Sequence, residues 1–187
     1  MLNDGVIILK PISINDTEFI INLINDIEVQ KQAFRNKPTY DFEHINWINK
    51  RNINDLDFLI IDIQTQQKMG RITMMNFDYQ NQKCEYGISI DCKFRRKGIA
   101  KKASKIIIDY VFTNFLINKI YLNVFSTNIS AINLYKILGF EKEGTFNKEI
   151  YKQGEWKDVI RMALFKYKWL EKIIIYIEII NYFNIYY

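Results

Sequence analysis

The sequence predicts one α/β domain in which helices pack against a β-sheet. The chain has 187 residues, about the length of a single domain, and a chain of this size buries a core without disulfide staples. Hydrophobic residues make up 49% and charged residues 25%, with 7 Gly and 2 Pro, which excludes collagen-like, low-complexity and wholly disordered chains. Segments with strand and helix patterns alternate along the chain without a Pro/Gly/Ser-rich linker, which is typical of layered α/β folds.

The N-terminal third predicts one strand and two helices. Val6–Lys10 has the pattern of a strand, and Ser13 followed by Asp16 resembles a helix start. Asp41 is expected to cap a second helix, and residues 30–39 form a polar stretch between the helices. The apolar stripes of the two helices are Phe19, Ile20, Leu23 and Ile24, and then Ile45, Trp47 and Ile48; the cations of the polar stretch are Lys31, Arg35 and Lys37.

The remainder predicts a strand-rich region interrupted by two helices. The expected strands are Phe58–Ile63, Arg71–Phe77, Glu85–Ile90, Lys119–Phe125, Glu143–Tyr151 and Asp158–Lys166. The expected helices are Ile99–Phe115 and Ser130–Leu138, the second of which is stopped by Gly139. Gly154 separates the last two strands as in a hairpin.

A basic loop, Arg95–Ala100 of sequence RRKGIA, opens the long helix. Backbone N–H groups at a helix start are unpaired and the helix dipole is positive there, so a phosphate suits this position. Gly98 lets the backbone approach a ligand closely. The alternative is a solvated loop that merely caps the helix, since the loop is neither a GxGxxG nor a Walker motif.

Two motifs follow one another in the second half of the chain. The first is R-x-x-G-x-A at Arg95–Ala100, and the second is N-x-x-A-x-x-L-Y-x-x-L-G-F at Asn128–Phe140. Together they resemble the GNAT superfamily of acyl-CoA N-acetyltransferases, from about Val6 to Trp169 and most specifically in Cys84–Phe140. The later pattern Y-x-x-G-x-x-x-D-x-I-x-M is similar to the branch that holds ribosomal-protein, polyamine and amino-sugar acetyltransferases.

The resemblance implies a GNAT fold, with a mixed central sheet of about seven strands that is splayed at the cofactor site and about four flanking helices. It implies acetyl-CoA as the acetyl donor and no metal. Residues 1–169 are then the acetyltransferase domain, and residues 170–187 are an apolar C-terminal tail.

The resemblance also implies the cofactor contacts. Backbone groups of Ile88, Ser89 and Ile90 are expected to meet the pantetheine arm. The pyrophosphate is expected on the basic loop and the start of the helix, with the residues Arg95, Arg96, Lys97, Gly98, Ile99, Ala100 and Lys101. Near the thioester, contacts are expected from Asn128, Ser130 and Tyr135.

In this family an acceptor amine attacks the thioester directly, without a covalent enzyme intermediate. Glu85 is the candidate base, because amines are mostly protonated near neutral pH; its alternative role is that of a structural carboxylate. Tyr135 matches the family position of the acid that protonates the leaving thiolate; its alternative role is aromatic packing. A backbone N–H near Ile88 is expected to stabilise the oxyanion.

The acceptor side is expected in the N-terminal half of the chain. His44 and Trp47 belong to a stretch loosely similar to the E-x-H-x-x-W of amino-sugar acetyltransferases, although His44 also fits a partly exposed helix histidine. Arg35 and its basic neighbours, with no acid in residues 30–39, favour an acceptor with phosphates, a nucleotide-linked amino sugar. The alternatives are spermidine or another small amine, a protein N-terminus and, from a different class, a non-catalytic acyl-CoA-binding module.

The net charge of +5 is mild, and the densest cations lie on the expected pyrophosphate loop, so no nucleic-acid partner is expected. Cys84 and Cys92 are expected on one strand about 26 Å apart, too far for a disulfide. A buried Cys84 thiol is favoured over a nucleophile. With a single His, a zinc site built from His and Cys is not expected either. The expected setting is reduced and cytoplasmic.

No signal peptide is expected at the N-terminus, and the apolar segment Ile173–Tyr187 is too short and too polar to cross a bilayer. Several of its isoleucines follow helical spacing. The tail is therefore expected to pack on the domain or to form a homodimer interface, the alternative being an incidental extension.

Overall fold

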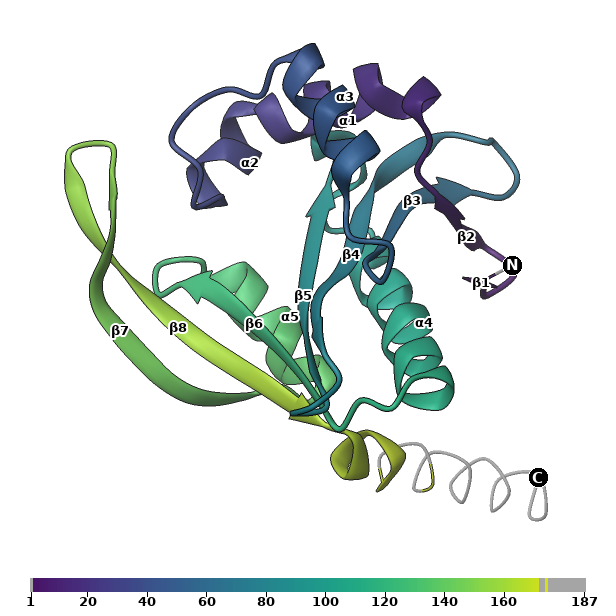
Figure 1. The fold of residues 1–187 in the computed structure, drawn as a ribbon, viewed down its shortest axis with the longest axis vertical. Coiled ribbons are helices and arrows are strands. Elements are labelled where there is room, and N and C mark those ends of the chain that lie inside the picture. The colour runs from purple at the N-terminus through teal and green to yellow at the C-terminus, as the bar shows by residue number, and fades with distance from the viewer. Residues whose placement is uncertain (1, 172–173, 175–187) are drawn as a thin grey trace.

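The computed structural model describes residues 2–171 and 174. Within them, eight strands form one mixed sheet with the order β1-β2-β3-β4-β5-β6-β8-β7 (Figure 1). The strands are β1 (Leu2–Asn3), β2 (Ile7–Pro11), β3 (Leu56–Asp62), β4 (Lys68–Asp78), β5 (Lys83–Ile90), β6 (Lys119–Phe125), β7 (Glu141–Lys152) and β8 (Glu155–Phe165). The expectation of about seven strands missed β1, because two residues are too few to carry a pattern.

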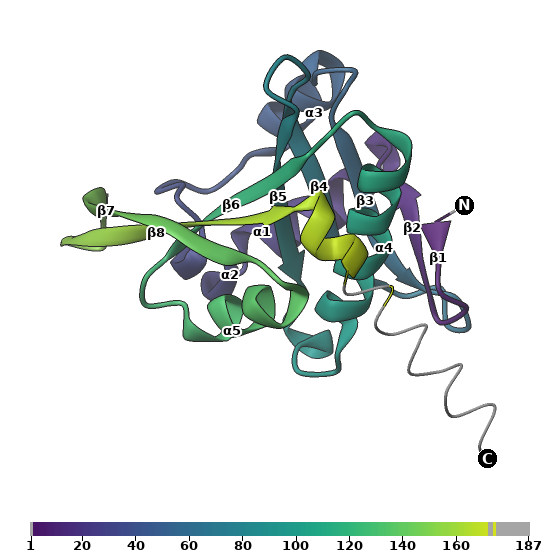
Figure 2. The same cartoon turned by 90° about the horizontal axis from the view of Figure 1, so that it is seen from below.

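Helices cover both faces of the sheet. The α-helices are α1 (Thr17–Asn25), α2 (Ile27–Gln32), α3 (Asp41–Lys50), α4 (Ile99–Asn114) and α5 (Ile129–Leu138), with 3-10 turns η1 (Ile14–Asp16) and η2 (Cys92–Phe94). The main core joins α4 and α5 to the sheet, and a smaller cluster joins α1 to β2 and β3 on the other side. Figure 2 shows the β7–β8 hairpin projecting away from the rest of the molecule, on the side opposite to the N-terminus.

The helix starts refine the sequence predictions. The N–H and hydroxyl of Ser13 both donate to the Asp16 carboxylate, at 3.0 and 2.8 Å, but they close the turn η1, and α1 begins at Thr17. Asp41 is not the cap of α3; that position belongs to Tyr40, because its N–H donates back to the Glu43 carboxylate at 3.2 Å.

The helix α2 was not expected, and its second half falls in the polar stretch of residues 30–39. Asp26 caps it by accepting hydrogen bonds from the N–H groups of Glu28 and Val29. No residue of α2 is buried, so it carries no apolar stripe that a periodicity analysis could detect.

The two cysteines do not share a strand, as the sequence suggested. Cys84 is buried in β5, whereas Cys92 is exposed in η2. The strand ends at Ile90 because Asp91 accepts a hydrogen bond from the N–H of Lys93 at 2.9 Å and starts a turn. Burial raises the pKa of the Cys84 thiol to about 12, which makes it a core residue rather than a nucleophile.

The end of the described chain is anchored to α4. Residues 166–171 are helical, and the buried Trp169 donates from its indole nitrogen to Asp109 Oδ1 at 3.5 Å. Apart from Ile174, the expected tail stripe at Ile173, Ile177 and Ile180 lies outside the described residues. Among the described residues, no helix has the length and apolar character needed to cross a membrane.

Candidate active site

The centre of the sheet opens between β5 and β6. The two strands pair in parallel over three residues, from Lys83 to Glu85 and from Lys119 to Tyr121. Beyond that point β5 stays paired with β4 as far as Ile90, and β6 stays paired with β8 as far as Phe125. The strands therefore continue but diverge, as Figure 1 shows, and the predicted splay is confirmed.

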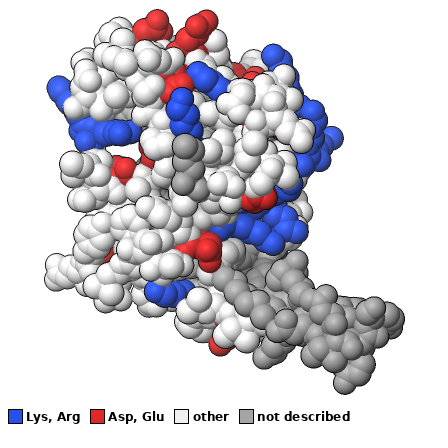
Figure 3. Space-filling view, turned by 90° about the vertical axis from the view of Figure 1, so that its right-hand side faces the viewer, with Lys and Arg blue, Asp and Glu red and all other residues white. Residues whose placement is uncertain are grey.

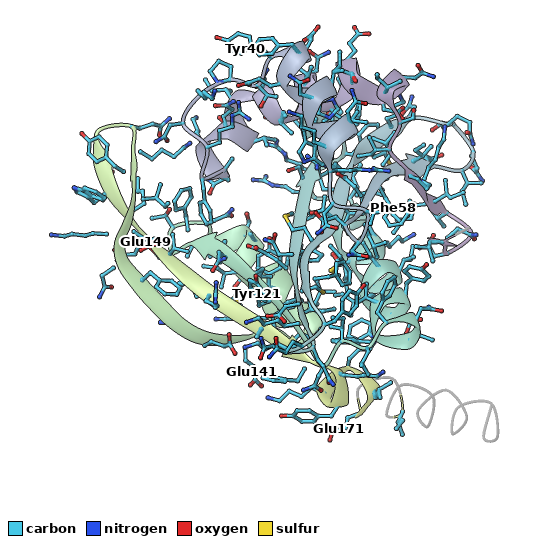
Figure 4. The ribbon with its side chains drawn as sticks, viewed as in Figure 1. Tyr40, Phe58, Tyr121, Glu141, Glu149 and Glu171 are labelled. Carbon is cyan, nitrogen blue, oxygen red and sulfur yellow. The ribbon has the colours of Figure 1, made fainter. Side chains whose placement is uncertain are left out.

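Glu85 lies at the narrow end of this splay and is held from three sides. Its Oε2 accepts from Asn76 Nδ2 at 2.8 Å and from the Tyr121 hydroxyl at 3.5 Å, and its Oε1 accepts from Asn123 Nδ2 at 3.1 Å. Burial, and next the charge of Glu85, raise the pKa of Tyr121. Figure 4 shows Tyr121 on β6 close to where β5 and β6 meet.

Glu85 and Tyr135 approach the splay from opposite faces of the sheet. Successive strand residues point to opposite faces, so Glu85 shares a face with its β4 partner Met75 and with Arg71, which packs under Trp47 of α3. The neighbouring Tyr86 points to the other face, where its ring meets Tyr135 of α5 at a centroid distance of 5.9 Å. We call these the α3 face and the α4 face.

Tyr135 is buried on the α4 face between the rings of Tyr86 and Phe140. Burial raises the pKa of Tyr135 to about 12, so the hydroxyl stays protonated at neutral pH. In the part of the chain that the structure describes, no group hydrogen-bonds to this hydroxyl. It is therefore available as a donor to a ligand in the splay.

The basic loop has the features of an anion site. Gly98 is the N-cap of α4 in the left-handed conformation (φ 77°), and no side chain caps the helix among the described residues. A Cβ on Gly98 would meet nothing within 4 Å, so the approach to the helix start is open. Arg96, Lys97 and Lys101 are exposed and form no ion pair with any described residue. These residues fit the pyrophosphate of a CoA donor.

Arg95, in contrast, is turned into the protein. Its guanidinium donates to the Ile90 carbonyl at 3.1 Å and to the Asp26 carboxylate at 3.1 Å. Because Asp26 also caps α2, Arg95 ties the basic loop to the helices of the α3 face. A phosphate contact by the Arg95 side chain, which the resemblance implies, would require it to leave these partners.

Asn128 and Ser130 form the cap of α5. Asn128 Oδ1 accepts from the Ala131 N–H at 3.2 Å and from the Ser130 hydroxyl at 3.1 Å. This gives both side chains a structural role, and their expected contacts with the donor stay a prediction. At the other end of α5, Gly139 is left-handed (φ 104°), as a helix C-cap requires.

Two of the expected acceptor residues, His44 and Trp47, are largely occupied by contacts within the protein. His44 is buried rather than partly exposed, with 3% of its surface accessible, because it packs between Thr17, at 3.3 Å from its Nδ1, and Trp47. Burial, and next the charge of Arg71, lower its pKa. Trp47 lies over the Arg71 guanidinium at 4.7 Å, so one face of its indole is already occupied.

Arg35 belongs to a loop that reaches across the α3 face to the hairpin. Its guanidinium donates to Glu43 at 2.6 Å, and Lys37 donates to the same carboxylate at 2.7 Å. Lys37, then the backbone N–H of Tyr40 and then Arg35 lower the pKa of Glu43 to about 2. The buried Lys152 of β7 donates to the Arg35 carbonyl at 2.6 Å. The loop is therefore bound at one side to Glu43 of α3 and at the other to the hairpin.

Several residues of the site were not foreseen. Asn76, Asn123, Tyr121 and Arg161 surround Glu85 or its partners. The sequence carries one signal for them, because Tyr121 and Asn123 are the polar alternate positions of an otherwise buried strand. The carboxylate that they contact depends on which strands are neighbours in the sheet, and the alternation of residues along one strand does not reveal this.

Comparison with known proteins identifies the family. The family model of the acetyltransferase (GNAT) domain matches residues 7–141. A spermidine N(1)-acetyltransferase of Escherichia coli K12 is 28% identical over 163 residues, which cover 87% of each chain. A spermidine N(1)-acetyltransferase of Vibrio cholerae is 29% identical over 167 residues, 88% of this chain and 95% of its own.

A solved structure of a spermidine N-acetyltransferase from Vibrio cholerae, in complex with CoA and spermine, superposes with a TM-score of 0.84 at 28% identity and covers 89% of this chain and 99% of its own. The similarity thus extends over nearly the whole described fold and includes the splay and the basic loop. The chain belongs to the GNAT acetyltransferase family and is an N-acetyltransferase that uses acetyl-CoA.

Proposed function

We propose that the protein transfers acetyl from acetyl-CoA to a primary amine of a polyamine such as spermidine. The observation that carries the transfer is the placement of Glu85 and Tyr135 on the two faces of one splay. The choice of a polyamine is supported by the names of the two relatives and of the solved structure, over nearly the full length of each.

The α3 face suits an extended alkyl amine. Phe34 of the loop after α2 packs edge-on against Phe125 of β6 at 4.9 Å, and Tyr121 and Phe146 lie on the same side of the sheet. Aromatic rings accept both methylene groups and ammonium groups. Glu85 adds one carboxylate among these rings, next to the splay.

The catalytic roles follow from this placement. Glu85 on the α3 face accepts the proton of the acceptor ammonium, directly or through a water. When bound, acetyl-CoA supplies the acetyl group as a thioester. A backbone N–H near Ile88, which has lost its β6 partner at the splay, donates to the carbonyl oxygen. The Tyr135 hydroxyl on the α4 face donates its proton to the leaving sulfur.

The amino-sugar acceptor that the sequence favours has weaker support. One of its two bases is the basic stretch in residues 30–39, which has no acid of its own. Lys31 pairs with Glu28, and Arg35 and Lys37 pair with Glu43, so most of this charge is neutralised within the chain. The relatives support the polyamine alternative better.

The test is acetyl-CoA-dependent thiol release with a matched set of acceptors. The arms are spermidine, a monoamine of similar length, a peptide with a free N-terminus and a nucleotide-linked amino sugar. Release with spermidine well above the monoamine supports the proposal, and the Glu85→Gln variant should abolish most of it. Release confined to the sugar or the peptide would overturn the polyamine assignment.

A further inference from the structure

Arg161 of β8 is an arginine on the α3 face that no step of the proposed reaction uses. It pairs across the sheet with Asn123 of β6, and its Nε donates to Asn123 Oδ1 at 3.2 Å. Its guanidinium lies over the rings of Tyr121 at 4.7 Å and Phe146 at 5.6 Å. Among the described residues it forms no ion pair with a carboxylate.

The contact with Arg161 decides which way the Asn123 amide points. An arginine side chain has donors and no acceptor, so the atom of Asn123 that faces Nε is the oxygen. The NH₂ group then faces Glu85, where Nδ2 donates to Oε1 at 3.1 Å. A reversed amide would place oxygen against oxygen at Glu85 and nitrogen against nitrogen at Arg161.

The two oxygens of the Glu85 carboxylate accept hydrogen bonds from different side chains. Asn76 and Tyr121 hold Oε2, whereas Asn123 holds Oε1. Asn123, the donor to Oε1, is itself oriented by Arg161. Without Arg161, the Asn123 amide could rotate, and the carboxylate would lose a fixed direction toward the splay.

We propose that Arg161 is a positioning residue that orients Glu85 through Asn123. The proposal rests on the proposed role of Glu85 as the base. Arg161 then contributes to the rate of the chemical step rather than to binding of the donor, and it acts through Glu85 alone. The contacts with the rings of Tyr121 and Phe146 hold the guanidinium beside the amide that it directs.

A double-mutant cycle tests this pathway. Arg161→Met keeps an apolar stem between the two rings and should lower kcat about 10- to 100-fold, the range for losing one hydrogen bond to a charged group, with the KM for acetyl-CoA nearly unchanged. Glu85→Gln should lower kcat further, and the double variant should equal Glu85→Gln alone. Asn123→Leu should reproduce Arg161→Met.

The controls separate positioning from other roles. Lys157→Met removes a cation from the same strand that pairs with Glu155 and should leave kcat unchanged. If Arg161→Met folds poorly, Arg161→Lys serves instead, with a smaller loss of kcat and the same non-additivity. Melting temperature and acetyl-CoA affinity report whether each variant is folded.

Two results would overturn the proposal. Additive effects of Arg161→Met and Glu85→Gln would show that Arg161 acts independently of Glu85. A raised acceptor KM in Arg161→Met, together with normal kinetics in Asn123→Leu, would make Arg161 a direct acceptor contact. A fully active Glu85→Gln variant would refute the base itself, and this outcome is distinct from the other two.

Discussion

Tyr135 and Glu85, the proposed acid and base, lie in two different environments. Tyr135 lies among aromatic rings on the α4 face, where burial raises its pKa to about 12, so it carries a proton throughout the neutral range. Glu85 lies among donors from three neighbouring side chains on the α3 face. In the proposed reaction, one face of the sheet therefore supplies the proton donor and the other supplies the proton acceptor.

Replacing Tyr135 by Phe keeps the ring packing with Tyr86 and Phe140 and removes only the hydroxyl. We expect kcat to fall by about 10²- to 10⁴-fold, the usual contribution of a general acid, while the affinity for acetyl-CoA stays within a few-fold. Steady-state kinetics and calorimetric titration of the donor measure the two quantities. The exposed Tyr40, replaced by Phe, is the matched control, and a Tyr135→Phe variant with most of the wild-type rate would remove Tyr135 as the acid.

Residues in continuous motifs could be predicted from the sequence, whereas residues joined across strands could not. Gly98, Tyr135 and Gly139 stand in motifs read along one segment. The start of α4 at Ile99 and the end of α5 at Gly139 are as expected. The chain of contacts from Arg161 through Asn123 to Glu85 crosses β8, β6 and β5. Its members become neighbours only through a strand order in which β8 lies between β6 and β7.

At the scale of elements, β4 supports the half of β5 that has no partner in β6. Gly70 pairs with Ile90 at the end of β5, directly beside the backbone that is expected to meet the pantetheine. A Cβ on Gly70 would lie well inside contact distance of the Ser89 carbonyl and 3.2 Å from Ile90 Cα. Both atoms belong to the backbone, so a side chain at this position must displace β5 itself.

We therefore expect Gly70→Ala to lower the free energy of unfolding by about 1–3 kcal/mol, as overpacking does, and to weaken acetyl-CoA binding at the same time. Thermal melts with and without acetyl-CoA measure both effects. Gly144→Ala is the matched control, because it also lies in a strand and its Cβ would meet nothing within 4 Å. A Gly70→Ala variant that is destabilised yet binds acetyl-CoA normally would contradict the link between this contact and the cofactor backbone.

Two elements with a strong apolar pattern lie within one residue of their predicted bounds, whereas the short α2, which polar contacts hold, was not predicted. The strand β6 has the predicted bounds, Lys119–Phe125, and α4 ends one residue before the predicted Phe115. The short α2 is held by the Asp26 cap and by the ion pair between Asp26 and Arg95. A residue nearly seventy positions away in the sequence supplies that pair, which local pattern analysis does not reach.

At the scale of the whole molecule, charge is distributed unevenly over the surface. The net charge is +5, and on the face drawn in Figure 3, Lys and Arg lie in separate groups interspersed with Asp and Glu. Near the start of α4, in contrast, Arg96, Lys97 and Lys101 stand without ion-pair partners among the described residues. The anionic donor is thus attracted both by the net charge and by this group, whereas a polycationic acceptor is opposed by the net charge.

The two substrates should therefore respond to salt in opposite ways. Raising the ionic strength from about 0.1 M to about 1 M shortens the Debye length from about 10 Å to about 3 Å. We expect kcat/KM for acetyl-CoA to fall several-fold over this range and kcat/KM for spermidine to stay level or rise, since screening removes attraction in one case and repulsion in the other. Lys97→Gln should make the acetyl-CoA dependence shallower without changing that of spermidine. A steep loss of kcat/KM for spermidine would instead mean that local carboxylates around the α3 face outweigh the net charge. The acceptor would then be attracted by a local negative potential, although the molecule as a whole is positive.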